Sequence, residues 1–381
     1  MKKSVLFVFS FILSLSFSYA ILPSDEQMRS MADTSLAPFY HGVASGDPTP
    51  NAVIIWTRVT PEEAGTITGT WRMALDTNFT SIVQSGTFST DSSRDYTVKI
   101  DVTGLSPNTW YYYEFTALGK NSLTGRTKTA PVGGVNQLRF AFVSCSNYPG
   151  GYFNAYDRIK DRNDVDAVLH LGDYIYEYAT NIGAPRTDQM PSSEIIRLID
   201  YRQRYSTHRL DPSTRKVHQQ YPFITVWDDH ETANNSYMNG AENHTTASEG
   251  PWSLRKAAGQ QAYDEWMPIR LPEPGNPNKI WRKISYGNLV DLFMLDTRLY
   301  ARTEQGVLAD SLRKLLGTEQ MAWLETELKN STAKWKILGQ QVMVGNLNPL
   351  WQLDGTGIIL NTDQWDGYQT ERKKIIRYYP E

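Results

Sequence analysis

The runs Phe140-Ala-Phe-Val-Ser-Cys145 and Ala167-Val-Leu-His-Leu-Gly-Asp173 decide the fold of this chain. Each run is short and apolar, which is typical of a buried strand, and residues 154–161 between them have the pattern of a short amphipathic helix. The carboxyl ends of neighbouring strands in an open parallel sheet form a crevice where ligands bind. We therefore expect Cys145 and Asp173 to lie together at such an edge.

The same alternation continues downstream and predicts a layered α/β domain over residues 137–381. Further strands are expected at 223–229, 289–296 and 335–342, with helices at Trp252–Trp266 and 318–328 between them.

Upstream, residues 39–128 carry short segments of alternating polarity separated by Gly, Pro, Asn and Asp. This pattern predicts an all-β sandwich similar to a fibronectin type III domain, with strands at 53–59, 70–75, 96–102 and 110–115. We find no chemistry in this segment and interpret it as a packing or interaction module.

The bulk properties are those of a globular chain of two domains. It has 381 residues, a formal net charge of -3 and interspersed acids and bases. This balance gives no signature of binding to nucleic acid or to an anionic membrane.

Residues 1–20 have the composition of a secretory signal peptide. Lys2 and Lys3 precede an apolar stretch at 5–17, and Ser18-Tyr19-Ala20 fits a small-residue cleavage site. We expect an exported protein, periplasmic or secreted, with no stable membrane anchor. Its single cysteine, Cys145, then has no partner for an internal disulfide. The alternative for Cys145 is a small buried apolar residue.

Polar groups of the kind that bind metals follow five of the predicted strands. In chain order these are Ser144-Cys145, Asp173 with Tyr176, Asp228-Asp229-His230-Glu231, Asp296-Thr297-Arg298 and Gln340-Gln341. One polar strand end is ordinary, because chains turn at polar residues. Five in succession favour a binuclear metallohydrolase, in which oxygen ligands hold two cations.

The residue types suggest which ligands each of the two cations takes. The Asp173 carboxylate can bridge both, and Tyr176 lies three residues further on. A phenol with a pKa of ~10 needs a strong Lewis acid such as ferric iron, and the Cys145 thiolate favours a transition metal over calcium. Asp229 offers a carboxylate to the second metal. His230 offers an imidazole that contacts substrate oxygens or protonates a leaving group.

Several of these residues have a structural alternative. Asp173 and Tyr176 could form a strand-end turn with a core tyrosine, and His230 could be a buried, hydrogen-bonded imidazole. Arg298 could contact phosphate, or it could form a salt bridge to Asp296 or another acid.

The motifs around these residues resemble the alkaline phosphatase D family of the calcineurin-like metallophosphoesterases. They are Phe142-Val-Ser-Cys145, His170-Leu-Gly-Asp-Tyr-Ile-Tyr-Glu177 and Trp227-Asp-Asp-His-Glu231. The resemblance implies an α/β metallophosphoesterase domain after a fibronectin-like domain, and an Fe3+–Ca2+ centre that hydrolyses phosphate mono- or diesters with metal-generated hydroxide.

The resemblance also implies residue roles. Cys145, Asp173 and Tyr176 are expected to bind iron, Asp229 the second metal, and Asp229 with His230 to form the catalytic group. Family members continue into a further strand ending in Gly-Asp-x-His, whereas this sequence stops at Glu381. We therefore expect a catalytic domain that is incomplete at its C-terminus. Two alternatives stay open: a phospholipase-D-type phosphodiesterase, or a non-catalytic secreted binding module if the truncation is natural.

Overall fold

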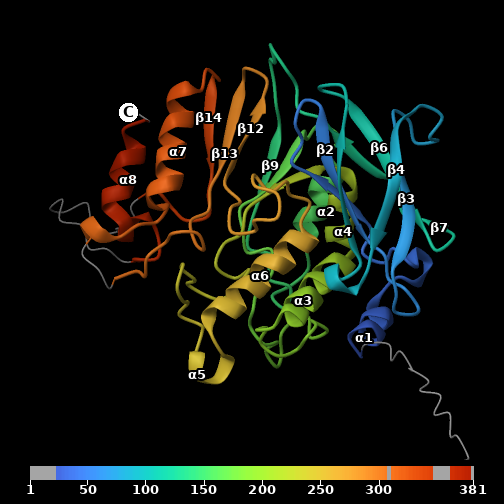
Figure 1. Ribbon diagram of the computed structural model, residues 1–381, viewed down its shortest axis with the longest axis horizontal. Helices are drawn as coiled ribbons and strands as arrows, with labels where there is room; N and C mark the ends of the chain where they lie inside the picture. Colours follow the sequence, from blue (N-terminus) through green and yellow to red (C-terminus); the bar gives the residue numbers. More distant parts are fainter. Residues whose placement is uncertain (1–22, 307–309, 346–360, 379–381) are drawn as a thin grey trace, which may run out of the picture.

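A six-stranded mixed sheet runs through the middle of the molecule in the order β5-β2-β1-β11-β10-β9 (Figure 1). The computed structural model describes residues 23–306, 310–345 and 361–378. The strands of this sheet are β1 (Val43–Gly46), β2 (Ala52–Arg58), β5 (Thr97–Thr103), β9 (Phe140–Val143), β10 (Ala167–His170) and β11 (Pro222–Thr225). β9, β10, β11 and β1 are parallel, and β2 and β5 extend the sheet in antiparallel fashion.

The N-terminal region forms an all-β sandwich. Its second sheet has the order β4-β3-β6-β7, with β8 also paired to β6. These strands are β3 (Ile67–Ala74), β4 (Ile82–Thr90), β6 (Trp110–Ala117), β7 (Lys120–Asn121) and β8 (Gly125–Lys128). Val53 and Ile55 of β2 pack against Tyr113 and Phe115 of β6 to form the core of the sandwich. Strands β1, β2 and β5 thus belong both to the sandwich and to the central sheet.

The pairing of β1 with β11 was not predicted from the sequence. Ser45 lies opposite Pro222 and Gly46 opposite Phe223. β2 was expected to alternate, yet all its residues are buried, because the sandwich covers one face and Trp266 packs against Trp56 on the other. The predicted order of an all-β sandwich followed by a layered α/β region is confirmed. The limits 39–128 and 137–381 stay a prediction.

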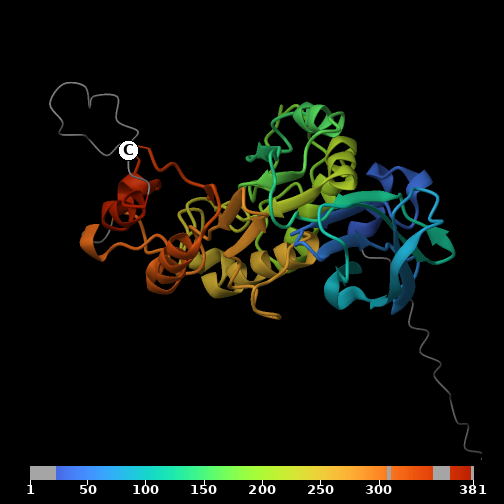
Figure 2. The same ribbon diagram turned by 90° about the horizontal axis from the view of Figure 1, so that it is seen from above.

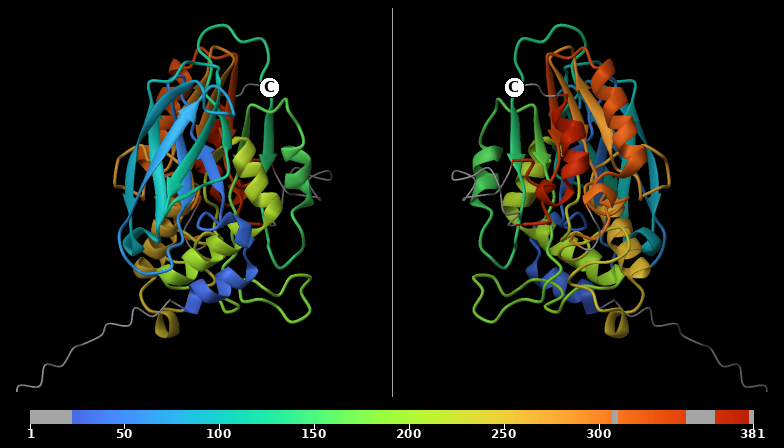
Figure 3. Two further views of the ribbon diagram at one scale, coloured as in Figure 1. Left: turned by 90° about the vertical axis from the view of Figure 1, so that its right-hand side faces the viewer. Right: turned by 90° about the vertical axis from the view of Figure 1, so that its left-hand side faces the viewer.

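Two pairs of helices cover the parallel part of the central sheet. Tyr156 of α2 (Asn154–Lys160) and Val217 of α4 (Pro212–Gln220) pack on Val168 and Phe223. On the other face, α3 (Leu198–Leu210) and α6 (Trp252–Trp266) pack on Leu169 and Ile224. The cyan strands of the sandwich and the green helix α2 lie on opposite flanks of the molecule (Figure 3).

A three-stranded sheet with the order β12-β13-β14 lies at the end of the molecule opposite the sandwich (Figure 2). Its strands are β12 (Arg282–Tyr286), β13 (Val290–Met294) and β14 (Trp335–Gly339). Leu324 of α7 (Gly317–Asn330) and Ile375 of α8 (Gln369–Ile376) share a core with Phe293. Short helices complete the fold: α1 (Pro23–Met31), α5 (Thr246–Glu249), and the 3-10 turns Thr34–Leu36, Ser92–Arg94, Asp310–Leu312 and Trp365–Tyr368.

The prediction that the run Phe140–Cys145 forms a buried strand is wrong as regards its burial. Among the described residues β9 is the edge strand of the sheet, with a paired strand on one side only, and the Phe142 side chain is 53% exposed. The predicted signal peptide lies outside the described residues. Within the described ranges, no helix combines the length and the apolar character needed to cross a bilayer.

Candidate metal centre

Three neighbouring strands, β9, β10 and β11, deliver the predicted residues to one place. The backbone is left-handed at Cys145 (φ 59°) and at Asp173 (φ 55°), just after β9 and β10. Non-glycine residues in this region are uncommon and concentrate at functional sites. The Cys145 amide donates to Gly172 O at 3.2 Å and the Ser146 amide to Asp173 O at 2.7 Å, so the two strand ends are held together.

Gly172 permits this approach. It has φ 97°, and a Cβ at this position would lie 2.5 Å from Asp228 Cβ. The segment after β10 can therefore lie directly against the segment after β11. A glycine is required here both by its backbone angle and by lack of space.

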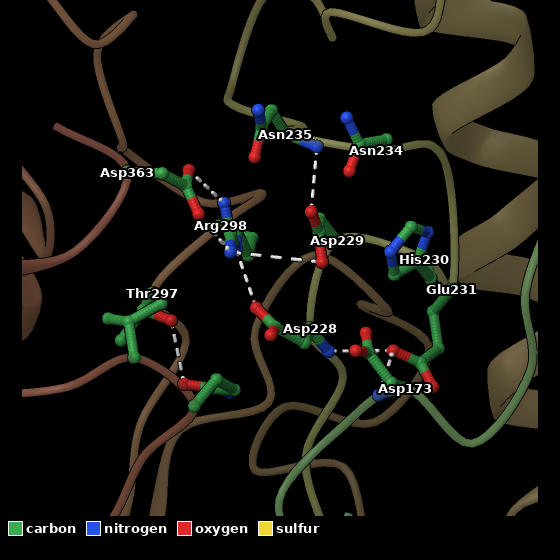
Figure 4. A network of polar contacts seen from close by, with 12 residues as sticks. Asp173, Asp228, Asp229, His230, Glu231, Asn234, Asn235, Thr297, Arg298 and Asp363 are labelled. Atoms are coloured by element: carbon green, nitrogen blue, oxygen red, sulfur yellow. Dashed lines mark hydrogen bonds and ion pairs between the residues drawn. The ribbon is translucent and has the colours of Figure 1, made fainter. Parts of the chain in front are cut away.

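Asp173 contacts several of the predicted residues, and it lies beside Glu231 at one side of the polar network around Arg298 and Asp229 (Figure 4). Its Oδ2 accepts hydrogen bonds from Cys145 Sγ at 3.4 Å and from Tyr176 Oη at 3.1 Å. Its Oδ1 is buried and has no hydrogen-bond partner among the described residues. Ligand atoms of Asp173, Asp229 and His230 lie within 4.8 Å of one another. One oxygen of the carboxylate thus gathers the thiol and the phenol, and the other is unpaired, which suits a carboxylate that bridges two cations.

The electrostatics of this cluster also suit a cation. Burial, followed by the charge of Asp229, raises the pKa of Asp173 to about 6. Burial raises the pKa values of the Cys145 thiol and the Tyr176 phenol as well, and Asp173 adds to both shifts. The carboxyl groups of Asp173 and Asp229, the Cys145 thiol and the Tyr176 phenol are four acidic groups close together. They cannot all be anionic without compensating positive charge. A multivalent cation would supply that charge and stabilise thiolate and phenolate.

Asp229 is held by the positive groups around it. Burial acts to raise its pKa, but Arg298 and His230 keep it below the usual value. Its Oδ2 accepts from the Asn235 amide at 2.7 Å, and Arg298 Nη2 lies 3.7 Å from its Oδ1. Asp229 therefore stays an anion with a fixed orientation, as a metal ligand requires.

Arg298 forms salt bridges and does not face the solvent. Its Nε donates to Asp228 Oδ1 at 2.6 Å, and its two terminal nitrogens donate to Asp363 at 2.6 and 2.8 Å. Its side chain is only 2% exposed. Of the two alternatives, the salt bridge is confirmed, with Asp228 and Asp363 as partners, while Asp296 accepts from the Arg298 amide at 2.8 Å.

Glu177 was missed as a functional residue. It is fully buried and accepts from His230 Nδ1 at 2.6 Å, from the Asn234 amide at 2.6 Å and from Asn243 Nδ2 at 2.9 Å. Burial acts to lower the pKa of His230, but Glu177 and nearby acids raise it to about 9. The only feature of the sequence that points to a role for Glu177 is its position, four residues after Asp173.

Glu231 was also given no role, and it ties the strand ends together. Its carboxylate accepts from the amides of Asp173 at 3.1 Å and Asp228 at 2.7 Å. A fully buried carboxylate with such bonds joins the segment after β10 to the segment after β11.

The polar residues that follow β13 and β14 support the cluster from the three-stranded sheet. Gln341, after β14, donates to Trp227 O at 2.6 Å and accepts from Thr297 at 2.7 Å. All five strand ends therefore converge, but the ends of β13 and β14 brace the site through Arg298 and Gln341.

The fold and the site define an α/β protein with a candidate binuclear metal centre at the ends of parallel strands. Comparison with known families and proteins gives a narrower answer. Residues 140–381 match the model of the PhoD-like phosphatase family, and residues 25–131 match the N-terminal domain of PhoD-like phosphatases. The chain belongs to the PhoD-like phosphatase family.

Two relatives have similar sequences or structures. Alkaline phosphatase D of Bacillus subtilis (strain 168) is 37% identical over 392 residues, which cover 96% of this chain and 66% of that protein. A solved structure described as that of PhoD has 37% identity and a TM-score of 0.82, covering 91% of this chain and 70% of the other. The chain thus spans slightly less than two thirds of the length of the curated relative.

Proposed function

We propose that this protein hydrolyses phosphate esters at a binuclear metal centre. The observation that carries the proposal is Asp173, whose Oδ2 gathers Cys145 and Tyr176 while its buried Oδ1 lacks a partner among the described residues. The name of the Bacillus subtilis relative, alkaline phosphatase D, supports this reaction.

The two sides of Asp173 suit different cations. Cys145 and Tyr176 offer a thiolate and a phenolate, which fit Fe3+, and Asp229 offers a carboxylate, which fits Ca2+. When bound, such cations lower the pKa of a water molecule and neutralise phosphoryl oxygens.

His230 acts on the substrate through one nitrogen. Its Nδ1 is occupied by Glu177, which leaves Nε2 to donate to a phosphoryl oxygen or to the leaving group. Asp229, kept anionic by Arg298, completes the catalytic pair and holds the second cation.

Metal analysis of the full-length protein with Tyr176→Phe and Asp173→Asn tests this proposal. Wild type should contain iron and calcium, show a tyrosinate-to-iron absorption band, and hydrolyse p-nitrophenyl phosphate or its bis ester. Tyr176→Phe should lose the band, and Asp173→Asn should lose metal and turnover. Asp164→Asn, an exposed acid at the surface, is the matched control. A band that persists in Tyr176→Phe, or wild-type turnover by Asp173→Asn, would contradict the assignment.

We also propose that the protein is exported, on the basis of the signal-peptide pattern of residues 1–20. N-terminal sequencing of protein from the native host should give a start near Ile21. A mature protein that retains Met1 would contradict export by this route.

A further inference from the structure

A cavity of ≈ 690 Å³ opens beside the candidate metal centre, and the proposed reaction assigns it no role. Tyr176, a proposed metal ligand, forms part of its wall, together with Asn147 from the segment after Cys145. Tyr178 also lines it, and its ring lies edge-on to the His230 ring with centroids 5.3 Å apart. A group attached to a phosphate at the metal centre would therefore reach this cavity.

The wall of the cavity is fixed by a buried arginine. Arg204 of α3 is fully buried and donates to the carbonyl oxygens of Tyr178 at 3.1 Å, Pro191 at 3.0 Å and Ser193 at 3.0 Å. It also donates to Tyr176 O and to Met190 O. One side chain thus joins both arms of the loop over residues 176–193, so the cavity is formed before a ligand binds. A preformed cavity lowers the entropic cost of binding.

The lining of the cavity has no positive charge. None of its described residues is Lys or Arg, and its one charged residue, Glu194, is paired with Arg255 at 2.8 Å. Tyr178 and Ile182, which are 42% and 106% exposed, present apolar surface. An anionic group entering here would lose water, gain no counter-charge and face Glu194.

One buried polar atom in the wall lacks a partner. Gln189 is 1% exposed, and its Nε2 donates to Thr180 at 3.2 Å, but its Oε1 has no hydrogen-bond partner among the described residues. A buried acceptor of this kind favours a ligand that carries a hydroxyl or amide donor.

We infer that this cavity binds the organic group of the phosphoester, and that it selects an uncharged group with an apolar or aromatic face and a hydrogen-bond donor. This inference rests on the proposed phosphoester hydrolysis and narrows its substrate class. Substrates with further anionic groups, such as additional phosphates or carboxylates, are disfavoured at this position.

Turnover of naphthyl phosphate and of its ring-sulfonated analogue by the full-length protein tests the selectivity. Wild type should have a kcat/KM about tenfold higher for the uncharged ester. Ile182→Lys, which adds a cation to the wall, should bring the two values close together by improving the sulfonated ester. Leu254→Lys is the matched control, because Leu254 is 68% exposed and does not line the cavity. Equal kcat/KM values in wild type, or the same shift in Leu254→Lys, would overturn the inference.

The binding of naphthol and of its ring-sulfonated analogue, measured by naphthol fluorescence, distinguishes failure of this inference from failure of the proposed reaction. If neither ester is hydrolysed, the proposed function fails. The cavity assignment still predicts that naphthol binds about tenfold more tightly than its sulfonate, and that Ile182→Lys reduces this difference in affinity. A hydroxyl in place of a methoxy group on the far ring should improve affinity about fivefold through Gln189. Absence of naphthol binding overturns the cavity assignment, and equal affinity of the hydroxyl and methoxy compounds overturns the donor requirement.

Discussion

Glu177 and His230 form a pair in which a carboxylate fixes the orientation of an imidazole. The same carboxylate also binds the Asn234 amide, so the ring and the loop that follows it are positioned together. Loss of a hydrogen-bond partner that orients a functional group typically lowers activity about 10–100-fold.

Glu177→Gln should lower kcat about 10–100-fold while iron content stays at the wild-type level. Glu177 raises the pKa of His230, so the protonated imidazole exists below about pH 9 and is lost as pH rises through that value. The alkaline limb of the pH–rate profile should therefore move to lower pH in the variant. Glu63→Gln, on the exposed surface of the sandwich, should leave the profile unchanged. A profile of Glu177→Gln that overlays wild type would exclude this role.

At the scale of elements, the site depends on the contact between the ends of β10 and β11. Gly172 makes that contact possible, and Glu231 bonds the amides on both sides of it. The geometry of the candidate metal centre therefore depends on how closely these two neighbouring strands can approach.

Gly172→Ala should destabilise the protein by roughly 2–5 kcal/mol, because the new Cβ adds both a backbone strain and an overlap with Asp228. Gly250→Ala is the matched control, since Gly250 has a similar φ of 83° and no atom within 4 Å of the added Cβ. It should cost only about 1–3 kcal/mol, from backbone strain alone. Urea unfolding measures both values. Equal losses would show that the close approach contributes nothing.

Buried histidines from β10, α3 and α4 surround the Tyr174 ring. The rings of His170, His208 and His218 lie 5.1, 5.7 and 5.7 Å from the Tyr174 ring. Burial lowers the pKa of His170 to about 3 from a usual value of 6.5. The folded protein therefore keeps this ring neutral at pH values where the unfolded chain protonates it.

The free energy of unfolding should therefore decrease as the pH falls from about 6.5 towards about 3, and the contribution of the neutral His170 ring should be complete above pH 6.5. His170 alone should lower the free energy of unfolding by about 2 kcal/mol between about pH 6.5 and about pH 5. In His170→Gln, which keeps a donor for Ser146, the free energy of unfolding should decrease by about 2 kcal/mol less than in wild type over this range. Denaturant unfolding at the two pH values gives the comparison. An identical pH dependence in both proteins would contradict it.

On the scale of the whole molecule, the two halves share one sheet. β1 of the sandwich pairs with β11, and Arg282 donates to Asp47 at 2.6 Å across the same boundary. A second ion pair joins Arg270 to Asp101 at 2.6 Å. We therefore expect the two halves to unfold as one cooperative unit.

A protease site inserted between the exposed residues Asn136 and Gln137 tests this unity. The nicked protein should elute as one species in native gel filtration and should unfold in a single thermal transition, because the backbone pairing of β1 and β11 does not depend on the linker. The two fragments should separate only in denaturant. Elution of two fragments under native conditions would show that the halves are independent.

The sequence predicted the parts of the site that follow from local pattern. Apolar runs placed the strands, and the polar residues after them placed Cys145, Asp173, Tyr176, Asp229 and His230 at one edge. Helix α3 was missed, because its residues are largely polar, including Arg204, His208 and Arg209, yet they are buried. Their burial depends on backbone carbonyls and aromatic rings far away in the sequence, which no local pattern contains.

By itself, then, the sequence determined the order of the layers and the residue types at the strand ends, because strand periodicity and turn chemistry are local properties. Only the tertiary structure decided that β1 joins the central sheet, that β9 lies at its edge, and that Arg298 pairs with Asp228 and Asp363. The reason is physical: strand order and the pairing of buried charges are set by contacts between segments distant in the chain. For the same reason, only the folded chain shows Glu177 behind His230 and an uncharged cavity beside Tyr176.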